Sequence, residues 1–448
     1  MSPPPTMHDR ASILSTGDEI VIGQLQDTNA CYLAQQLTAR GVRCVEHAAV
    51  GDDRATLVAA IRRLAEHSPL VIMSGGLGPT EGDLTRPALA QVMADQLVTD
   101  DAAAAALRAM LAKRGREAND HQMRQAQRPS RATCLSNSFG TAAGLRAIVQ
   151  VAAPHGVSEV FCLPGPPGEL RPMFEREVLP RLNVPPGMRI ITRLLHVVGV
   201  PEAEAVTRMG DLTRRTRNPL VGITASGGVL TLRIRYEGDA PELAATAQVD
   251  EAERLVRVAL GSTVFAAAED TLASVVLDRL KARGRRMAVV ESCSGGLLAS
   301  LLTAVPGSSA SFTGGWITYS NQAKERDVGV PNATLREHGA VSGPVATAMA
   351  LGGLERSCTD HCVAITGIAG PDGGSEAKPV GTVWIAHAWR DAGRTEVDAR
   401  LFRFTGDRDD VRGRSARAAL ALVYFALTAD AGIARSGPLL WEMPTGSR

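Results

Sequence analysis

The chain has 448 residues, of which 45% are hydrophobic, enough to build two or more separate hydrophobic cores. Its 48 basic and 47 acidic residues nearly cancel, so no global field attracts nucleic acid or an anionic membrane. The longest apolar stretches fall short of the roughly 20 residues that a membrane span needs. We therefore expect a soluble protein without nucleic-acid or membrane partners.

The first ten residues, MSPPPTMHDR, are rich in proline and lack the apolar core of a secretory signal. We expect a disordered segment over residues 1–10 and a cytoplasmic location. Seven scattered cysteines fit reduced thiols better than a disulfide framework. The segment CTDHC at 358–362 offers two cysteines and a histidine, but no second cluster completes the four ligands of a zinc site.

Strand-like and helix-like segments alternate from residue 11 onward. ASILS, VRCVEHAAV and PLVIMS read as strands, whereas TNACYLAQQLTARG and DDRATLVAAIRRLAEH carry apolar residues at helical spacing. This order predicts a parallel sheet covered on both faces, with ligands beyond the carboxyl ends of its strands. Residues 100–127 also read as helix. We assign residues 11–180 to this first α/β domain.

Residues 220–236 contain two β-rich runs joined at Gly227 and Gly228, which is typical of a hairpin. We expect a small α+β linking domain over 181–268. A second alternation of helices and strands indicates another α/β domain over 269–430, followed by a C-terminal tail over 431–448. The predicted fold class is thus α/β, with two domains of mainly parallel sheet joined by a small β-containing unit.

The loop SGGLGPTEGDLT, residues 74–85, follows a buried strand and precedes a helix. Glycines permit close approach to the backbone, and amides at a helix start favour a phosphate or another anion. Asp83 could hold a divalent cation against that phosphate, or it could simply cap the helix. Taken alone, the loop is compatible with a ligand site and with a structural turn.

The stretch VVESCSGGLLAS, residues 289–300, places Ser292 between a buried strand and a helix. Such a turn can present a nucleophilic hydroxyl beside the amides of residues 294–296, which could stabilise an oxyanion or a phosphate. A capping turn with Ser294 as N-cap explains the same residues without chemistry. Cys293 is intrinsically more nucleophilic than serine, but a small buried thiol is the commoner state.

A serine nucleophile needs a base, and Lys324 is the best candidate. It would lie in the first turn of a helix capped by Asn321, where the helix dipole disfavours a cation. Lowering its pKa from about 10.4 to about 7 requires roughly 4 to 5 kcal/mol, more than the dipole supplies, so burial must contribute. The alternative is an ordinary solvated lysine beside Glu325 and Arg326.

Four segments resemble, in order and spacing, the N-terminal domain of CinA (competence/damage-inducible) proteins: STGDEIVIGQLQDTNACYLAQQL, SGGLGPTEGDLT, NSFGTAAGL and LPGPPGEL. The resemblance implies a molybdopterin-binding-like domain with a nucleotide pocket and a pyrophosphatase activity toward ADP-ribose. It implies a divalent cation, together with potassium, and the cation would bind Asp83. The nucleotide-binding residues carried over are Asn29, Gly75, Gly76, Gly78 and Thr80.

This sequence departs from that family pattern at three places. Gly82 precedes Asp83 where the family has paired acidic residues, and Ala143 stands in place of a proline. The opening Gly-Thr-Glu of the family is here Thr16-Gly17-Asp18-Glu19. The loss of one carboxylate weakens the expected metal site.

Five further segments resemble the nicotinamide mononucleotide amidohydrolase domain of the same family: ESCSGG, VPGSSASFTGGWITYSNQAKERDVGV, HGAVS, AITGIAGPDGGSEAKPVGTVW and FTGDRDDVR. The resemblance implies hydrolysis of nicotinamide mononucleotide to nicotinic acid mononucleotide and ammonia, a step of pyridine nucleotide salvage, without a cofactor. It implies that Ser292 is the nucleophile and Lys324 its base, with Tyr319 assisting. Family members are commonly dimers, so we expect a homodimer.

Substrate binding needs groups for the phosphate of the mononucleotide. Arg408, four residues before Arg412 on one helix face, is the main candidate. The alternative is that the two arginines are exposed and only balance the charges of Asp409 and Asp410. The expected substrate-binding residues are Ser294, Gly295, Gly296, Ser308, Ser309, Thr366, Gly367 and Arg408. A protein that binds nucleotides at both pockets without turnover is the non-enzymatic alternative.

Overall fold

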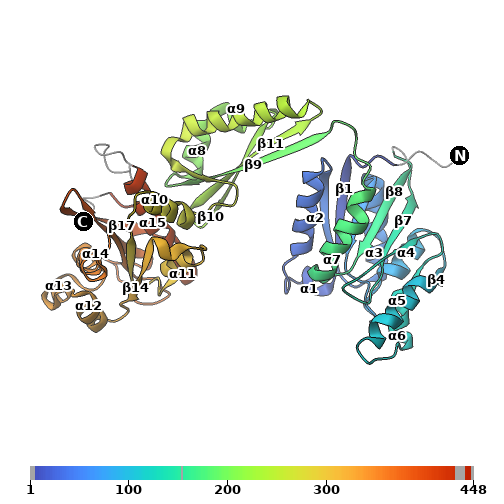
Figure 1. Ribbon diagram of the computed structural model, residues 1–448, viewed down its shortest axis with the longest axis horizontal. Coiled ribbons are helices and arrows are strands. Elements are labelled where there is room, and N and C mark those ends of the chain that lie inside the picture. The colour runs from blue at the N-terminus through green and yellow to red at the C-terminus, as the bar shows by residue number, and fades with distance from the viewer. Residues whose placement is uncertain (1–5, 153–154, 429–438, 445–448) are drawn as a thin grey trace. The chain divides into compact units, whose positions relative to one another are not determined.

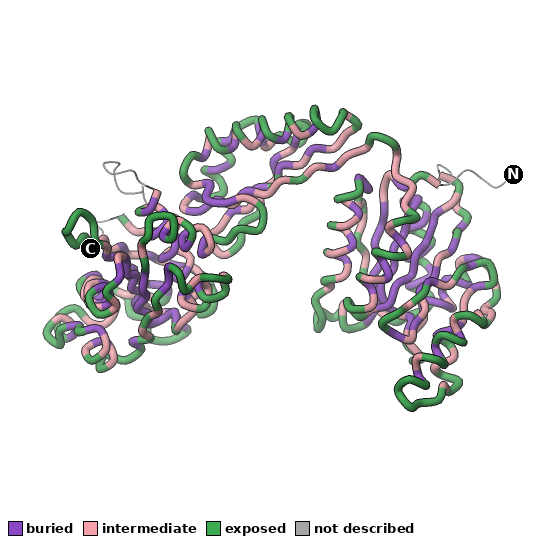
Figure 2. The backbone as a smooth tube through the Cα atoms, in the orientation of Figure 1, coloured by how far each residue is buried: buried purple, intermediate pink, exposed green. Residues whose placement is uncertain are grey.

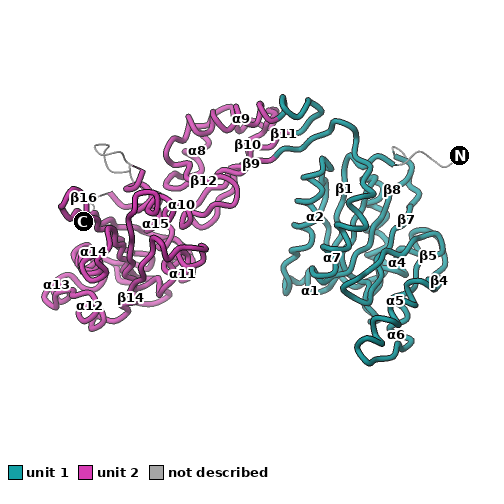
Figure 3. Tube along the Cα trace, in the orientation of Figure 1, with its two compact units in different colours: residues 1–191, 237–245 teal, residues 192–236, 246–448 magenta. Residues whose placement is uncertain are grey.

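The computed structural model describes residues 6–152, 155–428 and 439–444. The chain divides into two compact units, residues 1–191 with 237–245 and residues 192–236 with 246–448 (Figure 3). In the ribbon view, each unit contains sheet strands with helices packed beside them (Figure 1). Among the described residues no helix has both the length and the apolar character needed to cross a membrane.

The first unit is built on a six-stranded sheet of order β2-β1-β3-β8-β7-β6. The four strands at the β2 end run parallel, and β7 and β6 are antiparallel to their neighbours. The strands of this sheet are β1 (Arg10–Thr16), β2 (Arg43–Val50), β3 (Leu70–Ser74), β6 (Thr133–Leu135), β7 (Gly144–Gln150) and β8 (Val157–Leu163). A two-stranded ladder joins β4 (Leu97–Thr99) and β5 (Gln127–Pro129). The helices are α1 (Asp18–Val21), α2 (Thr28–Ala39), α3 (Arg54–His67), α4 (Thr85–Val92), α5 (Asp101–Ala112), α6 (Asp120–Met123) and α7 (Pro167–Met173).

Successive residues of the central strands point to opposite faces of this sheet, and each face has its own core. Ile72 packs in a core with α2 and α7, whereas its neighbour Met73 packs in a core with α3 and α4. The buried central strands are visible in Figure 2. A strand buried on both faces reads as a continuous apolar run, which is why LVIM was recognisable in the sequence.

The second unit begins with a four-stranded sheet of order β10-β11-β9-β12. Its elements are β9 (Arg189–Val198), α8 (Glu202–Met209), β10 (Leu220–Ser226), β11 (Val229–Gly238), α9 (Glu242–Leu260) and β12 (Val264–Ala267). The predicted hairpin is confirmed: β10 pairs antiparallel with β11, and Ser226 faces Val229 across Gly227 and Gly228.

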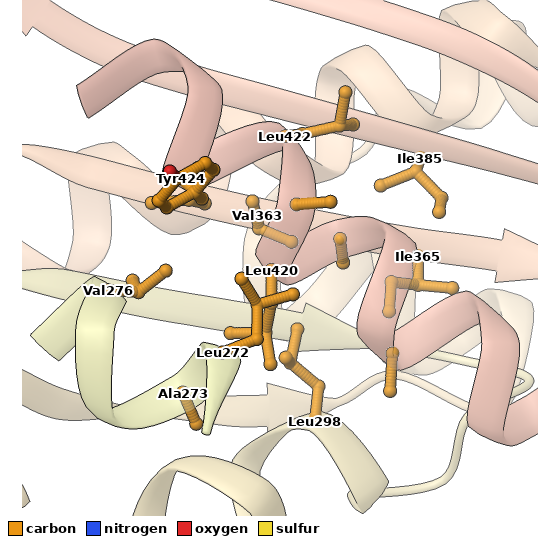
Figure 4. Close-up of a cluster of buried hydrophobic side chains, with 14 of the residues drawn as sticks. Leu272, Ala273, Val276, Leu298, Val363, Ile365, Ile385, Leu420, Leu422 and Tyr424 are labelled. Atoms are coloured by element: carbon orange, nitrogen blue, oxygen red, sulfur yellow. The ribbon is translucent and has the colours of Figure 1, made fainter. Parts of the chain in front are cut away.

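This small sheet shares a core with the rest of the second unit. Phe265 packs edge-on against Tyr424, with ring centroids 6.1 Å apart, and the Tyr424 hydroxyl donates to the Ser262 carbonyl. Val198 and Phe265 belong to the same buried cluster as the core of the C-terminal part (Figure 4). The linking segment therefore belongs largely to the second compact unit, where the sequence led us to expect a separate body.

The main sheet of the second unit has the order β14-β13-β15-β16-β17. Its strands are β13 (Met287–Glu291), β14 (Phe312–Ile317), β15 (His361–Gly367), β16 (Thr382–Asp391) and β17 (Arg394–Arg403). Its helices are α10 (Leu272–Ala282), α11 (Leu297–Thr303), α12 (Asn321–Val328), α13 (Asn332–His338), α14 (Gly343–Ser357) and α15 (Arg408–Thr428). One core lies toward α10, α11 and α15, and another toward α13 and α14.

This second sheet is mixed, and the expectation of a mainly parallel sheet does not hold for it. β13 is parallel to β14 and β15, but β16 is antiparallel to both of its neighbours. A tight turn at Ala392 and Gly393, both with positive φ, returns the chain as the β16–β17 hairpin. The fold class α/β with several sheets is confirmed, and the first sheet is mostly parallel.

Parts of the predicted disordered N-terminus and of the predicted C-terminal tail contact the rest of the structure. Residues 1–5, 429–438 and 445–448 lie outside the described residues. His8 is buried: its Nε2 lies 3.0 Å from a Glu159 oxygen, and β1 already starts at Arg10. Near the other end, the Arg414 guanidinium lies 5.0 Å from the centroid of the Trp441 ring, and Leu439 is buried. Segments with buried partners of this kind are held in place.

The predicted helix over 100–127 is shorter in the structure. α5 ends at Ala112, three residues before Gly115.

Two stacked histidines make the second unit sensitive to acid. His361 and His387 are 2% exposed, and Nδ1 of His361 lies 3.1 Å from Nε2 of His387. Burial lowers the pKa of His361 to about 4 and lowers that of His387 well below its usual value. Because these folded-state values lie below the unfolded value of about 6.5, the unfolded chain binds more protons, and stability falls as the pH drops from about 6.5 toward 4.

We expect His361 alone to reduce the free energy of unfolding by about 2 kcal/mol between pH 7 and pH 5. The four tryptophans of the chain, at 316, 384, 389 and 441, all lie in the second unit, so tryptophan fluorescence during urea unfolding reports on this unit. The double variant His361→Phe/His387→Phe should lose most of this pH dependence, whereas His338→Gln should retain it. Equal acid sensitivity of the double variant and the wild type would contradict the assignment.

Candidate active site

The stretch VVESCSGGLLAS forms a tight turn at the carboxyl edge of the second unit's main sheet. β13 ends at Glu291, and the next amide, that of Ser292, donates to the Ile365 carbonyl on β15 at 2.9 Å. The chain then enters α11 through Gly296, whose φ of 92° lies in the left-handed region that favours glycine. Ser292 is 7% exposed, so the turn presents its hydroxyl in a sheltered position.

The carboxylate of Glu291 holds this turn in place through hydrogen bonds, a role that was not predicted from the sequence. Its side chain is 1% exposed, and its carboxylate accepts the amides of Gly296, Leu298 and Ala299 at 2.8 to 3.1 Å. Of the amides of residues 294–296, which were expected to face a phosphate or an oxyanion, Glu291 therefore takes that of Gly296. The available signal was a carboxylate at the end of a buried strand, separated from a helix start only by the short SCSGG turn.

The hydrogen bonds of the other amides in the turn limit which N–H groups could donate to an oxyanion. The Gly295 amide donates to the Ser292 carbonyl at 3.1 Å, so neither Gly295 nor Gly296 offers a spare N–H. The amides of Cys293 and Ser294 donate to no oxygen of the described residues. The side-chain oxygen of Ser294 is fully buried and also lacks a partner there. Of the amides of residues 294–296, only that of Ser294 has no oxygen acceptor among the described residues, and Ser294 does not cap α11.

Lys324 is the second functional side chain of the site. It lies in the first turn of α12, whose N-cap is Ser320 and not the expected Asn321, since the Ser320 hydroxyl accepts the Ala323 amide. The Lys324 side-chain nitrogen Nζ lies 3.1 Å from Ser292 Oγ and donates to the Thr318 carbonyl at 2.8 Å. Lys324 is 1% exposed, which does not fit the alternative of a solvated lysine.

Burial determines the charge state of Lys324. It lowers the pKa of this amine from 10.5 to about 8, and within the described ranges no carboxylate lies near enough to form an ion pair with it. A neutral amine can accept a proton from a hydroxyl at hydrogen-bond distance. The Ser292–Lys324 pair therefore has the geometry of a nucleophile and its base, and the lowered pKa makes the neutral amine accessible at mildly alkaline pH.

The helix that carries Lys324 is held by close packing with α14. A Cβ at Gly352 of α14 would lie 1.8 Å from the Val328 carbonyl, at the last residue of α12. Only glycine allows this approach of the two backbones. The position of Lys324 relative to the sheet is thus fixed by helix packing as well as by its own hydrogen bonds.

Cys293, between Ser292 and Ser294, is not arranged as a nucleophile. It is buried among the apolar side chains of the core, and burial raises the pKa of its thiol to about 12. The reactive form of a cysteine is the thiolate, so this thiol stays inert at neutral pH.

Tyr319 and two arginines lie near the same edge of the sheet. Tyr319 is 63% exposed, and its hydroxyl accepts from Arg408 at 3.1 Å. The Arg408 guanidinium also donates to the Gly370 carbonyl, whereas Arg412 donates to the Ser294 carbonyl at 3.3 Å. Within the described part of the chain, no hydrogen bond joins Tyr319 to Ser292 or Lys324. From the sequence, Arg412 was expected only to share a helix face with Arg408. In the structure, Arg412 is the arginine that contacts the turn containing Ser292.

The other predicted substrate residues fall into two groups. Thr366 and Gly367 end β15 beside the Ser292 turn, and the Thr366 hydroxyl donates to the Ala340 carbonyl. Ser308 and Ser309 precede β14, at the opposite edge of the sheet, about 15 Å away along the strand. Their assignment to this site is wrong within one copy of the chain, because β13 and β14 are parallel and α11 carries the chain back across the sheet.

The first unit contains a separate cavity of about 600 Å³ at the carboxyl edge of its own sheet. Every residue predicted there lines it: Asn29, Gly75, Gly76, Gly78, Thr80 and Asp83. Asn29 donates to the Ser74 hydroxyl and to the Gly165 carbonyl, which joins the loops that follow β3 and β8. The lining includes five carboxylates and no lysine, arginine or histidine.

The predicted metal site in this cavity is not formed. The Asp83 carboxylate already accepts the Gly78 amide, the Thr80 amide and the Thr80 hydroxyl, at 2.5 to 2.7 Å. Gly82 supplies no second carboxylate, and no group of three acidic, histidine or cysteine side chains in the described segments could hold a metal ion. Asp83 fixes the Gly-rich loop, and it does not cap α4, whose N-cap is Leu84.

Comparison with known proteins places the whole chain in one family. Residues 12–184 match a model for a probable molybdopterin binding domain, residues 192–266 a damage-inducible protein CinA KH domain, and residues 269–427 a CinA C-terminal domain. A CinA-like protein of Anaeromyxobacter sp. is 40% identical over 93% of this chain and 98% of its own length. A CinA-like protein of Geobacter sulfurreducens is 38% identical over 92% of this chain and 97% of its own.

A solved structure, that of a competence-damaged protein (CinA) superfamily protein from Klebsiella pneumoniae, is 38% identical over 35% of this chain and 96% of its own, with a TM-score of 0.33. The architecture defines an α/β protein with a cavity in its first unit and a buried serine–lysine pair in its second. The similarity along nearly the full length of its relatives makes this chain a member of the CinA family.

Proposed function

We propose that the second unit hydrolyses the carboxamide of nicotinamide mononucleotide, releasing ammonia and nicotinic acid mononucleotide. One observation supports this proposal above the others: the nearly inaccessible Lys324 amine lies 3.1 Å from Ser292 Oγ. Burying an amine without a counter-ion costs stability, and a general base next to a serine is a chemical use for it.

The residues account for each step of the reaction. Neutral Lys324 takes the Ser292 proton as Oγ attacks the carboxamide carbon. The tetrahedral intermediate collapses when the ammonium of Lys324 returns that proton to the amide nitrogen, which leaves as ammonia. Water, deprotonated by the same amine, then cleaves the acyl-enzyme and restores the Ser292 hydroxyl. The Thr318 carbonyl holds Nζ in place, and the amides of Cys293 and Ser294 are the donors available for the oxyanion.

Arg412 and Arg408 are the proposed contacts for the substrate phosphate. Arg412 lies at the nucleophile turn, and Arg408 lies between Tyr319 and Gly370 at the exposed rim. Guanidinium groups bind phosphate through charge-assisted hydrogen bonds. In this arrangement Tyr319 positions Arg408, and its assistance to Ser292 stays a prediction.

The direct experiment measures ammonia release from nicotinamide mononucleotide by the full chain in the presence of a chelator. We expect turnover to survive chelation, because the Ser/Lys chemistry uses no metal. No release under these conditions would overturn the proposal.

The rate should follow the protonation state of Lys324. Because its pKa is lowered to about 8, kcat/KM should fall about tenfold per pH unit below 8 and level off above it. A pH–rate profile from pH 6 to 10 measures this. A rate that still rises tenfold per pH unit between pH 9 and 10 would show a solvated lysine, and a flat profile would exclude Lys324 as the base.

For the first unit we propose nucleotide binding, supported by its 600 Å³ cavity with a Gly-rich wall. Its side chains do not form a metal-ligand set, so we derive no pyrophosphatase step there. Calorimetric titration of ADP-ribose, with and without magnesium, tests this. Hydrolysis of ADP-ribose that requires magnesium would restore the pyrophosphatase alternative, and the absence of binding in both conditions would refute a nucleotide pocket.

A further inference from the structure

The second unit contains another cavity, of about 540 Å³, at the seam between its small sheet and its main domain. This volume lies within the range of small-molecule pockets. Its walls come from β9, β11 and β12 on one side and from α10, α11 and α15 on the other. It contains neither Ser292 nor Lys324.

The walls of this seam cavity are largely apolar. Phe265, Leu272 and Leu420 line it, and all three belong to the shared core, where Figure 4 shows Leu272 and Leu420. His196 is the ionisable ring in the wall, but both of its nitrogens have partners, Thr231 Oγ1 at 3.1 Å and the Ala268 carbonyl at 2.9 Å. The cavity therefore favours an apolar body over a polar one.

Arg417 contributes a charged guanidinium to this largely apolar wall. It is half-buried, its guanidinium lies against the backbone of Gly227, and it has neither a hydrogen bond nor an ion pair with any described residue. Its neighbours on α15 differ, since Arg412 pairs with Asp409 and Arg414 with Asp410. A guanidinium stays charged in proteins, and a partly desolvated one without a partner is a ready contact for an anion.

The other charged residues of the wall do not form an ion pair with Arg417. Glu269 and Asp270 line the cavity but are exposed to water and form no ion pair with Arg417. α10 begins in the wall at Leu272, so the positive end of its dipole lies at the cavity as well. Apolar walls with one guanidinium that is not paired to the two water-exposed carboxylates fit a ligand with an apolar body and one acidic group.

Two helices connect this cavity to the candidate active site. α11 contributes Leu301 to the wall and begins at the Ser292 turn. α15 contributes Arg417 and Leu420 and begins at Arg408, whose side chain contacts Tyr319. The cavity wall therefore includes residues of two helices, α11 and α15, that begin beside the site, but none of α12, which carries Lys324.

We propose that this cavity is a regulatory binding site for a small amphipathic anion, and that its occupation alters turnover at Ser292. The regulatory part rests on the proposed amidohydrolase function, whereas the binding part does not. A suitable probe is 8-anilinonaphthalene-1-sulfonate, which combines flat aromatic rings with one sulfonate.

The experiment titrates the full chain with this probe and follows both probe fluorescence and calorimetry. We expect one saturable site. Arg417→Gln should raise Kd about tenfold, and Ala304→Phe should abolish binding, because Ala304 is an exposed residue of the cavity wall whose enlargement fills the space. Arg254→Gln, which removes an exposed arginine of α9, should bind like the wild type.

Several weak sites, or equal binding by Arg417→Gln and the wild type, would overturn the binding site. Ammonia release at saturating probe tests the coupling: we expect a change of at least twofold in kcat that is absent in Ala304→Phe. An unchanged kcat would refute regulation while the binding result stands. A wild type that binds the probe but releases no ammonia would refute the proposed function and not the cavity.

Discussion

Replacing Lys324 by methionine should lower kcat for ammonia release by about 10³-fold while the protein stays folded. A general base contributes roughly 10² to 10⁴ in rate, and methionine fills nearly the same space without an amine. The folded-state pKa of about 8 lies below the unfolded value, so the wild type loses stability as the pH falls from about 10.5 to about 8. At pH 7 the variant is free of that cost and should unfold at no lower urea concentration than the wild type.

The matched control is Lys281→Met, which removes an exposed lysine from the last turn of α10 and should leave kcat unchanged. The combination of lost turnover with retained stability is diagnostic. A Lys324→Met protein that keeps more than a tenth of wild-type kcat would show that another group accepts the Ser292 proton. Lost activity together with lost stability would point to a structural lysine.

Ser292→Ala should have a similarly large effect, a loss of about 10³-fold or more in kcat, since it removes the atom that forms the acyl-enzyme. The change deletes one oxygen from a side chain that is 7% exposed, so the turn should keep its hydrogen bonds to Ile365 and Gly295. Rapid-quench measurement of the first turnover would show whether any acyl-enzyme forms.

The adjacent Cys293→Ala variant separates the two nucleophiles. Its thiol packs in the core with a pKa of about 12, so we expect kcat within about threefold of the wild type, together with a modest loss of stability. The double variant Ser292→Ala/Cys293→Ala should be no slower than Ser292→Ala alone. Residual turnover in Ser292→Ala that disappears in the double variant would assign the residual attack to Cys293.

Much of the fold follows from local patterns. β3 was readable as LVIM because each residue enters one of two cores, and the β10–β11 hairpin was readable from its two adjacent glycines. The contact of Ser292 with Lys324 was predictable because each follows a neighbouring parallel strand, and such ends meet at one edge of a sheet.

Other features depend on information that no local pattern carries. GSSAS contains the right hydroxyls, but Ser308 and Ser309 lie at the wrong edge, since that depends on which end of β14 they precede. β17 reads as a charged segment, RTEVDARLFR, because only its inner face is buried as an edge strand beside β16. The Glu291 carboxylate turns back onto its own helix start, a contact set by the turn geometry rather than by residue type alone.

The Glu291 carboxylate also bears on selectivity. This carboxylate takes three amides at the start of α11, which are the donors that an anion would need at such a helix start. The catalytic turn is consequently preassembled before any substrate arrives. Under the proposed function, the phosphate of the substrate would have to bind elsewhere, for example at Arg408 and Arg412, and Ser292 would meet only the uncharged carboxamide.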